Sequence, residues 1–141
     1  MVKHTISSQV IVAGEASGAV LRLSEPLSLW GGLNPDTGEI IDRHHPQSGE
    51  IVTGKMIVMP SGRGSSSASS ILLEAVRQRT APAGIILREM DGILALGAVV
   101  ARELYEIDLP VVVVATDDYD LLIDGSIITI QHNGTLRITQ S

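Results

Sequence analysis

The sequence contains no cysteine and no phenylalanine, and Trp30, Tyr105 and Tyr119 are its only aromatic residues. Without thiolates, the chain by itself can form no disulfide, no zinc–thiolate site and no cysteine-ligated iron–sulfur cluster. With so few rings, its core must be built from aliphatic side chains. Basic residues are also scarce, since ten Lys and Arg against sixteen Asp and Glu give a net charge of −6. We therefore expect no nucleic-acid binding, which needs a basic face and stacking rings.

Long apolar runs are missing as well. The opening MVKHTISSQV contains no apolar signal segment, and the longest uncharged apolar runs have the length of a strand rather than of a membrane span. With 141 residues, of which 44% are hydrophobic and 18% charged, the chain suits a single folded domain over residues 1–141. We expect a cytoplasmic protein that makes no contact with a membrane.

The middle of the chain alternates between predicted strands and helices. Short apolar runs predict three buried strands, over residues 55–59, 83–88 and 111–115. Two helices are predicted between them: one follows a serine-rich run, and the other covers 92–105 with Asp91 as its N-cap. Continuous apolar strands that alternate with helices are typical of βαβ units with a parallel sheet.

Both ends of the chain predict antiparallel strands, over residues 5–12, 18–23, 126–131 and 135–139. The last two form a hairpin around Asn133-Gly134, a dipeptide that favours tight turns. The predicted fold class is therefore α/β, with three layers (β/β/α), a parallel βαβαβ centre and flanking antiparallel strands. A polar stretch over residues 30–50 is long for a loop inside a compact domain, and such loops are often functional.

The segment SGRGSSSASS, residues 61–70, is the main candidate site because it joins a predicted strand to a predicted helix. Gly62 and Gly64 allow the backbone to turn sharply and to approach a ligand closely. Arg63 adds a planar guanidinium that suits a carboxylate or a phosphate.

The serines of this segment reinforce the prediction of an anion site. We expect Ser65 at the helix N-cap, with Ser66 and Ser67 in the first turn. The N–H groups at that end and the helix dipole would attract a negative charge. The alternative is that Ser65 only caps the helix, although one serine would be enough for that.

Other motifs match known sites less well. GEIVTGK (49–55) resembles a phosphate-binding loop, but Met56 follows it and the context predicts a strand. GRGSSS (62–67) lacks the third glycine of a dinucleotide fingerprint. The histidines form no evident hydrolase triad, His44-His45 with nearby acids has no metal-ligand spacing, and the acids of 115–124 suit a solvated turn and helix start.

Four segments carry a resemblance to a known family: GGLNPDTGEIIDRHHP (31–46), KMIVMPSGRGSSSASSILLEA (55–75), TAPAGIIL (80–87) and DGILALGAVVA (91–101). Over essentially its whole length the chain resembles the small subunit of the aconitase X dehydratases. This resemblance implies an aconitase-type swivelling domain made as a separate polypeptide, with a β/β/α fold. It also implies a large partner subunit that carries the iron–sulfur cluster, so that this chain binds no cofactor itself and is inactive alone.

The resemblance implies an active site at the subunit interface, where a small hydroxy-carboxylate substrate loses water. By position Ser65 matches the serine that acts as the base. The implied substrate-binding residues are Arg63, Gly64, Ser66 and Ser67 from the turn, with Asp42 and His45 from the 30–46 loop. A dry interface, the helix N-terminus and Arg63 would stabilise the Ser65 alkoxide.

The substrate stays open between two members of the family. The sequence of residues 60–70 (PSGRGSSSASS), which is closer to the bacterial type of the family, and the low lysine content favour cis-3-hydroxy-L-proline. The alternative is mevalonate 5-phosphate, which would make the chain a phosphomevalonate dehydratase small subunit. Two other classes of function also stay open: a non-enzymatic anion-binding or regulatory module, and a structural subunit that only closes the partner's cleft.

Overall fold

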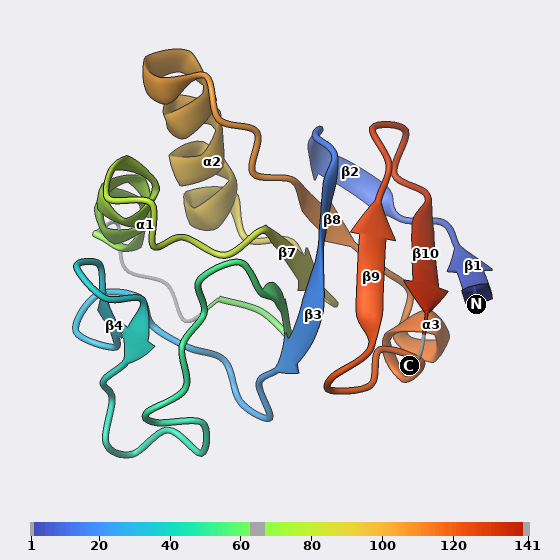
Figure 1. Ribbon diagram of the computed structural model, residues 1–141, viewed down its shortest axis with the longest axis horizontal. Coiled ribbons are helices and arrows are strands. Elements are labelled where there is room, and N and C mark those ends of the chain that lie inside the picture. The colour runs from blue at the N-terminus through green and yellow to red at the C-terminus, as the bar shows by residue number, and fades with distance from the viewer. Residues whose placement is uncertain (1, 63–66, 140–141) are drawn as a thin grey trace.

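The structure is a computed structural model that describes residues 2–62 and 67–139 (Figure 1). Within them the strands are β1 (Val2–Ile6), β2 (Gln9–Val12), β3 (Ala16–Arg22), β4 (Leu33–Asn34), β5 (Glu39–Ile40), β6 (Met56–Met59), β7 (Gly84–Leu87), β8 (Val111–Val113), β9 (Ile127–Ile130) and β10 (Leu136–Thr139). The helices are α1 (Ala68–Arg77), α2 (Gly92–Tyr105) and α3 (Thr116–Tyr119). No helix in the described part of the chain is long and apolar enough to cross a bilayer.

Strand β3 joins two parts of one sheet, whose order is β1-β10-β9-β3-β6-β7-β8-β2. Residues 16–19 pair with β9 in antiparallel fashion, and residues 20–22 pair with β6 in parallel fashion. Strands β6, β7 and β8 are parallel, and β2 closes the far edge as an antiparallel strand. Figure 1 shows the antiparallel strands on one side of β3 and the two long helices on the other.

The parallel strands are buried on both faces. Ile57 and Ile85 face a core shared with α1 and α2, whereas Val58 and Ile86 face a second core shared with the antiparallel strands. Alternate residues of a strand point to opposite faces, so these continuous apolar runs serve two cores at once. The predicted α/β class and its three layers, with a parallel centre and antiparallel flanks, are confirmed.

The prediction of one strand over residues 5–12 is wrong. The chain forms β1 and β2 instead, and β1 pairs with β10 while β2 pairs with β8. The break falls at Ser7-Ser8, which interrupts the apolar alternation, and the Ser8 hydroxyl donates to the carbonyl of Gly134 at 2.7 Å. A polar pair in the middle of a strand pattern therefore marks the crossing from one edge of the sheet to the other.

The two long helices start in different ways. Helix α2 begins as predicted, because Asp91 Oδ1 accepts from the N–H groups of Ile93 and Leu94 at 2.9 and 3.2 Å. Helix α1 begins two residues later than predicted, since its N-cap is Ser67 rather than Ser65. Any serine of the run suits an N-cap. The buried face of α1, which starts at Ala68, selects among them.

Strands β3, β6, β7 and β8 run in the same direction and end at Arg22, Met59, Leu87 and Val113. We call this side of the sheet the carboxyl edge. Four segments leave it: the long polar loop 23–55, the turn 60–67, the β7–α2 connection 88–91 and the segment that leads into α3. Ligands of open α/β sheets bind at such edges, so the site is expected on this side of the sheet.

Candidate functional site

The glycine–serine turn leaves the sheet beside the β7–α2 connection. The carbonyl of Pro60, the first residue after β6, accepts from the N–H groups of Arg88 and Glu89 at 3.1 and 2.9 Å. The turn rejoins regular structure at Ser67, the N-cap of α1. The remaining residues predicted in the turn, Arg63, Gly64, Ser65 and Ser66, lie outside the described residues.

The start of the turn is packed against the cap of α2. A Cβ atom on Gly62 would lie 1.9 Å from Asp91 Oδ2 and 3.1 Å from Leu94 Cδ1. Only glycine fits this close approach. Since the other oxygen of Asp91 caps α2, one carboxylate both caps a helix and limits the side chain at Gly62.

The N-termini of α1 and α2 both lie at the carboxyl edge, but they differ in charge. In α2 the carboxylate of Asp91 caps the helix and neutralises the positive end of its dipole, which is stabilising. In α1 the Ser67 side chain makes no capping hydrogen bond, and the first turn contains no acidic residue. The positive end of the α1 dipole is therefore not neutralised by its own first turn, which suits an anion bound from outside.

The two predicted site residues of the long polar loop have different surroundings. His45 is buried, and its Nε2 donates to the carbonyl of Glu25 at 3.0 Å while its Nδ1 accepts from the N–H of Gln47 at 3.0 Å. The neutral tautomer with hydrogen on Nε2 satisfies both bonds. Asp42 is half-buried, and its Oδ1 accepts from the N–H of His44 at 3.0 Å. Both ring nitrogens of His45 are thus used within the chain.

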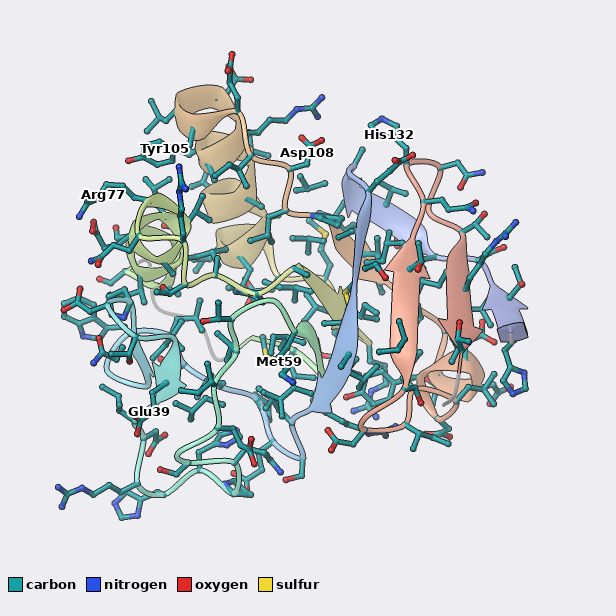
Figure 2. The ribbon with its side chains drawn as sticks, viewed as in Figure 1. Glu39, Met59, Arg77, Tyr105, Asp108 and His132 are labelled. Carbon is teal, nitrogen blue, oxygen red and sulfur yellow. The ribbon has the colours of Figure 1, made fainter. Side chains whose placement is uncertain are left out.

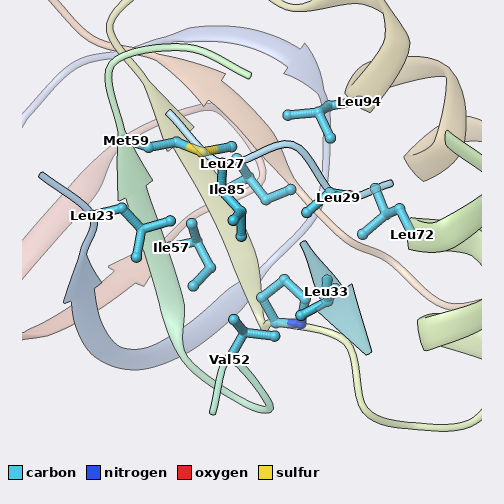
Figure 3. Close-up of a pocket in the computed structure, with 11 residues that line it drawn as sticks. Leu23, Leu27, Leu29, Leu33, Val52, Ile57, Met59, Leu72, Ile85 and Leu94 are labelled. Atoms are coloured by element: carbon cyan, nitrogen blue, oxygen red, sulfur yellow. The ribbon is translucent and has the colours of Figure 1, made fainter. Parts of the chain in front are cut away.

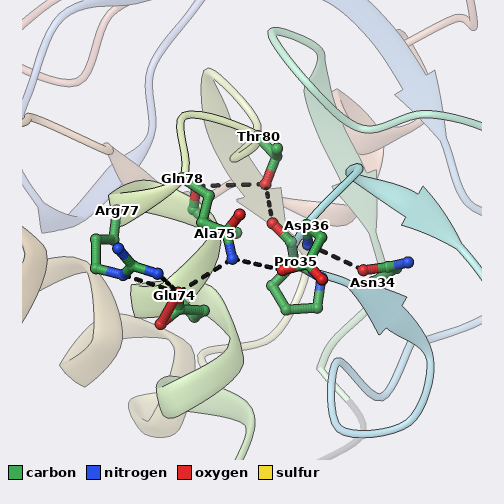
Figure 4. A network of polar contacts seen from close by, with 8 residues as sticks. All are labelled: Asn34, Pro35, Asp36, Glu74, Ala75, Arg77, Gln78 and Thr80. Atoms are coloured by element: carbon green, nitrogen blue, oxygen red, sulfur yellow. Dashed lines mark hydrogen bonds and ion pairs between the residues drawn. The ribbon is translucent and has the colours of Figure 1, made fainter.

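Another part of the same loop is tied to the opposite end of α1 (Figure 4). The Thr80 hydroxyl donates to the carbonyl of Pro35 at 2.6 Å, and Gln78 Nε2 donates to the carboxylate of Asp36. The N–H of Asp36 in turn donates to Asn34 Oδ1 at 2.9 Å. Residues 34–38 (NPDTG) therefore anchor the loop to the C-terminal end of α1.

This anchor lies far from the turn. Helix α1 has 10 residues, which span about 15 Å between its two ends. At the anchored end Arg77 donates to the carboxylate of Glu74 and holds the pKa of that group below its ordinary value. Residues 34–36 of the loop therefore fasten it to the C-terminal end of the helix.

One of the four histidines, His132, lies away from the carboxyl edge and offers no base there. His132 lies on the hairpin between β9 and β10, at the opposite edge of the sheet (Figure 2). Among residues 2–62 and 67–139, no three His, Asp or Glu side chains are grouped so that they could hold a metal ion. These residues therefore do not fit an iron–sulfur cluster, and the sequence has no thiolate to offer one.

A small cavity of about 20 Å³ lies between the sheet and the helices (Figure 3). Its lining is apolar and includes Leu29, Leu72, Ile85 and Leu94. A space of this size holds at most one water molecule, and its lining side chains offer no polar partner to keep one. This cavity is therefore too small and too apolar to hold a hydroxy acid.

The sequence analysis missed three residues at this edge. Arg22 ends β3, Arg88 follows β7, and Tyr119 ends α3, and both guanidinium groups lie against the tyrosine ring. The only local signal was that two arginines follow apolar strand residues, which by itself does not predict a meeting with Tyr119.

The fold and the carboxyl edge define a small α/β domain that presents one glycine–serine turn at a helix N-terminus and lacks cluster ligands in its described residues. The sequence model of a family described as the aconitase X swivel domain matches residues 5–138. The chain belongs to this family.

The most informative relatives differ in length. The chain is 51% identical over 108 residues to a cis-3-hydroxy-L-proline dehydratase of Pseudomonas aeruginosa, which covers 77% of this chain but 19% of that protein. The chain thus spans about a fifth of the length of that relative. It is 40% identical over 96 residues to a phosphomevalonate dehydratase small subunit of Methanothermobacter thermautotrophicus, covering 68% of this chain and 73% of that one.

A solved structure has the same fold along nearly all of the chain. The crystal structure of Thermococcus kodakaraensis aconitase X in its holo form matches with a TM-score of 0.86 and 29% sequence identity. The match covers 97% of this chain and 99% of that one. The architecture seen in Figure 1 is therefore that of an aconitase X swivel domain.

Proposed function

We propose that this chain is the small subunit of a heteromeric aconitase X-type hydro-lyase that removes water from a small hydroxy acid. The relatives named above carry dehydratase activity in their names, and one is itself a small subunit. The observation that carries the proposal is the position of the glycine–serine turn. It connects the end of β6 to a helix N-terminus whose first turn has no acidic residue. An anionic substrate and an alkoxide both gain from that potential.

In the proposed mechanism Ser65 is the general base. Its alkoxide accepts the proton on the carbon next to the substrate carboxylate, and the electron pair of that C–H bond forms a C=C bond. The hydroxyl group leaves the adjacent carbon with the electron pair of its C–O bond, and the proton taken up by Ser65 is then released to this hydroxide, so that one water is lost overall and the alkoxide is restored. The substrate anion is held by four residues of the turn: Arg63, Gly64, Ser66 and Ser67. Asp42 is a further substrate-binding residue, which comes from the long loop. His45 acts as a positioning residue, because both of its ring nitrogens hold the loop.

The rest of the site would come from a large subunit, which we propose also holds the iron–sulfur cluster. A domain that completes its site with a partner must offer that partner an apolar surface. Trp30 is 59% exposed and Met90 is 63% exposed, and both lie in segments that leave the carboxyl edge. We also propose that residues 1–141 act as one domain, that the protein is cytoplasmic, and that it binds neither nucleic acid nor membranes.

For the substrate we favour cis-3-hydroxy-L-proline. The Pseudomonas aeruginosa relative named for that activity is 51% identical over 108 residues, whereas phosphomevalonate dehydratase small subunits are 40% identical over 96 residues and 48% identical over 80 residues. Phosphomevalonate is the alternative, and the second relative supports it because the chain matches most of its length. Both substrates carry a carboxylate, so the proposed role of the turn is the same for either.

The test is to co-express the chain with a candidate large subunit and to assay the purified complex on both substrates. We expect dehydration of one of them by the complex and none by the chain alone. Ser65→Ala should lower kcat by about 10²- to 10⁴-fold, the usual contribution of a general base, while the complex still assembles. Ser70→Ala is the matched control, because Ser70 is exposed on α1 one turn beyond the N-cap.

Three outcomes would count against the proposal. Near-normal turnover by the Ser65→Ala complex would remove the assigned base and leave a purely structural subunit. Stable binding of a carboxylate or phosphate ligand by a solitary chain, without any dehydratase activity in a complex, would favour a regulatory module. Equal losses in the Ser65→Ala and Ser70→Ala complexes would point to a damaged helix rather than to lost chemistry.

A further inference from the structure

The ring of Tyr119 lies against two arginine side chains at the carboxyl edge. The guanidinium carbon of Arg22 is 4.6 Å from the ring centroid, and that of Arg88 is 5.5 Å from it. Tyr119 is only 3% exposed, and its hydroxyl is buried without a hydrogen-bond partner among the described residues. A buried ring that contacts two cations gains cation–π attraction, so it can hold guanidinium groups in place.

Arg22 is largely used within the chain. Its Nη1 donates to the carbonyls of Tyr119 and Leu122 at 3.2 and 3.0 Å, and its Nη2 lies 4.0 Å from Asp120 Oδ1. These bonds connect the end of β3 to α3 and hold the Arg22 guanidinium in place beside the tyrosine ring. Arg22 is therefore a structural residue, and it has few donors left for a ligand.

Arg88 is different, because it is exposed and its side chain has no hydrogen bond or ion pair within residues 2–62 and 67–139. The contact with the ring of Tyr119 is its one interaction of note there. A guanidinium that stacks on a ring keeps its N–H groups, which lie in the guanidinium plane, available for an oxyanion. Holding the group in advance also reduces the entropy lost when a ligand binds.

The position of Arg88 connects it to the turn. Strand β6 lies between β3 and β7, so Arg22 and Arg88 flank the point where the turn leaves the sheet. The backbone N–H of Arg88 donates to the carbonyl of Pro60 at 3.1 Å, which makes it a direct neighbour of the first residue of the turn. An exposed guanidinium thus belongs to a residue beside the segment that carries the proposed base.

We propose that Arg88 is a substrate-binding residue that takes an anionic group, a carboxylate or a phosphate, of the hydroxy acid, and that Tyr119 is its positioning residue. This inference rests on the proposed function, because it places the substrate at the same turn. Charge-assisted bonds from a planar guanidinium to an oxyanion are among the stronger polar contacts. Arg88 would therefore contribute mainly to substrate binding and less to the chemical step.

The first test uses the assembled complex with the Arg88→Gln and Arg88→Lys variants. We expect Arg88→Gln to raise KM about 10- to 100-fold with kcat changed less than about threefold, the pattern of lost substrate binding. The KM of Arg88→Lys should lie between those of the wild type and of Arg88→Gln, since lysine keeps the charge but loses the planar fork. Arg137→Gln is the matched control, because Arg137 is exposed on β10, away from the carboxyl edge.

The role of Tyr119 has its own readout. Tyr119→Leu removes the ring under Arg88, so KM should rise in the same direction as for Arg88→Gln. Tyr119→Phe keeps the ring and should return KM to within about threefold of the wild-type value. The double variant Arg88→Gln/Tyr119→Leu should be no worse than Arg88→Gln alone, because the ring then has nothing to position. Melting curves of each variant identify any loss that comes from unfolding.

Two results on the complex would overturn the inference. An unchanged KM in Arg88→Gln would show that the substrate does not use this side chain. Loss of assembly in Arg88→Gln, on size-exclusion chromatography, would show that Arg88 instead pairs with an acidic group of the large subunit. In either case the turnover lost in Ser65→Ala would still support the proposed function, so the two failures are distinguishable.

If the complex dehydrates neither substrate, the inference still has a direct test on the full chain. Inorganic phosphate is titrated while the Nε–H signal of Arg88 is followed by NMR. A saturable shift in the wild type and in Arg137→Gln, lost in Arg88→Gln, would support an oxyanion site without any reference to activity. A shift that is the same in Arg88→Gln, or no saturable shift, would overturn it.

Discussion

Gly62 and Asp91 are packed so closely that a Cβ atom on Gly62 would lie 1.9 Å from Asp91 Oδ2. The two residues belong to different connections, the β6–α1 turn and the β7–α2 segment. Because Asp91 also caps α2 through its other oxygen, it cannot move aside without giving up its bonds to Ile93 and Leu94. The geometry of the turn and the stability of α2 therefore depend on each other.

The first prediction follows from this contact. Gly62→Ala should lower the free energy of unfolding by about 1–2 kcal/mol, because Asp91 must be displaced and the cap weakened. Urea unfolding of the chain measures the change. Gly92→Ala is the matched control: a Cβ atom on Gly92 would meet nothing within 4 Å, so this variant should be neutral or slightly stabilising. Equal effects of both variants would argue against the contact.

The second prediction concerns His45, which is buried at 5% exposure and bonded through both ring nitrogens. His45→Ala should cost about 2–4 kcal/mol, because two hydrogen bonds are lost and polar backbone groups lose their partners. His44→Ala changes an exposed neighbour and should stay within about 0.5 kcal/mol of the wild type. A comparison of the two by denaturant titration tests whether this imidazole holds the loop, and similar costs would contradict it.

The third prediction concerns Glu106, which follows α2 with a φ of 56° in the left-handed region. Glycine adopts this conformation without strain, and a carboxylate at a helix C-terminus is also opposed by the dipole. Glu106→Gly should therefore stabilise the chain by about 0.5–1 kcal/mol. Glu103→Gly, inside the helix, should destabilise it by about 1 kcal/mol. Thermal melts of both variants measure the contrast, and a loss of stability in Glu106→Gly would refute the argument.

The fourth prediction is a pH dependence at the alkaline side. Burial raises the pKa of the Tyr119 hydroxyl above its ordinary value near 10, although Arg22 and Arg88 oppose the shift. The unfolded chain therefore loses this proton at a lower pH than the folded chain does. The protonated Tyr119 makes its full contribution to the free energy of unfolding below about pH 10. This contribution falls as the pH rises from there toward the raised pKa of the folded state.

Tyr119→Phe isolates this effect, because it removes the titrating group and keeps the ring. The difference in unfolding free energy between wild type and Tyr119→Phe should be constant below about pH 9 and should shift in favour of the variant above about pH 10. Since the hydroxyl is buried without a partner among the described residues, Tyr119→Phe should also be neutral or stabilising near neutral pH. A difference that does not vary with pH would contradict the assignment.

Sequence reasoning succeeded where the signal was local and strong. The apolar runs predicted β6, β7 and β8, and the hairpin between β9 and β10 forms around Asn133-Gly134 as expected. Helix α2 has the predicted bounds because residues close together in the sequence determine both its apolar face and its Asp91 cap. The start of α1 was misplaced by two residues because several adjacent serines could each cap it.

The candidate site shows the limits of the same reasoning. Its chemistry could be predicted from the glycines, serines and arginine of the turn, and this part stays a prediction for Arg63, Gly64, Ser65 and Ser66. The attachment of the long loop could not be predicted, because Pro35 and Asp36 bond to Thr80 and Gln78, which lie 45 and 42 positions away in the sequence. Such contacts have no local signature.

By itself the sequence determined an aliphatic, thiol-free chain with buried strands, helices between them and one turn suited to an anion. These properties depend on composition and on the spacing of neighbouring residues. Only the tertiary structure decided that Arg22 meets Tyr119, 97 positions away, and that Arg88 contacts the same ring beside the turn. The physical reason is strand order: which strands are adjacent determines which side chains meet at the edge, and the periodicity of a single strand does not contain that information.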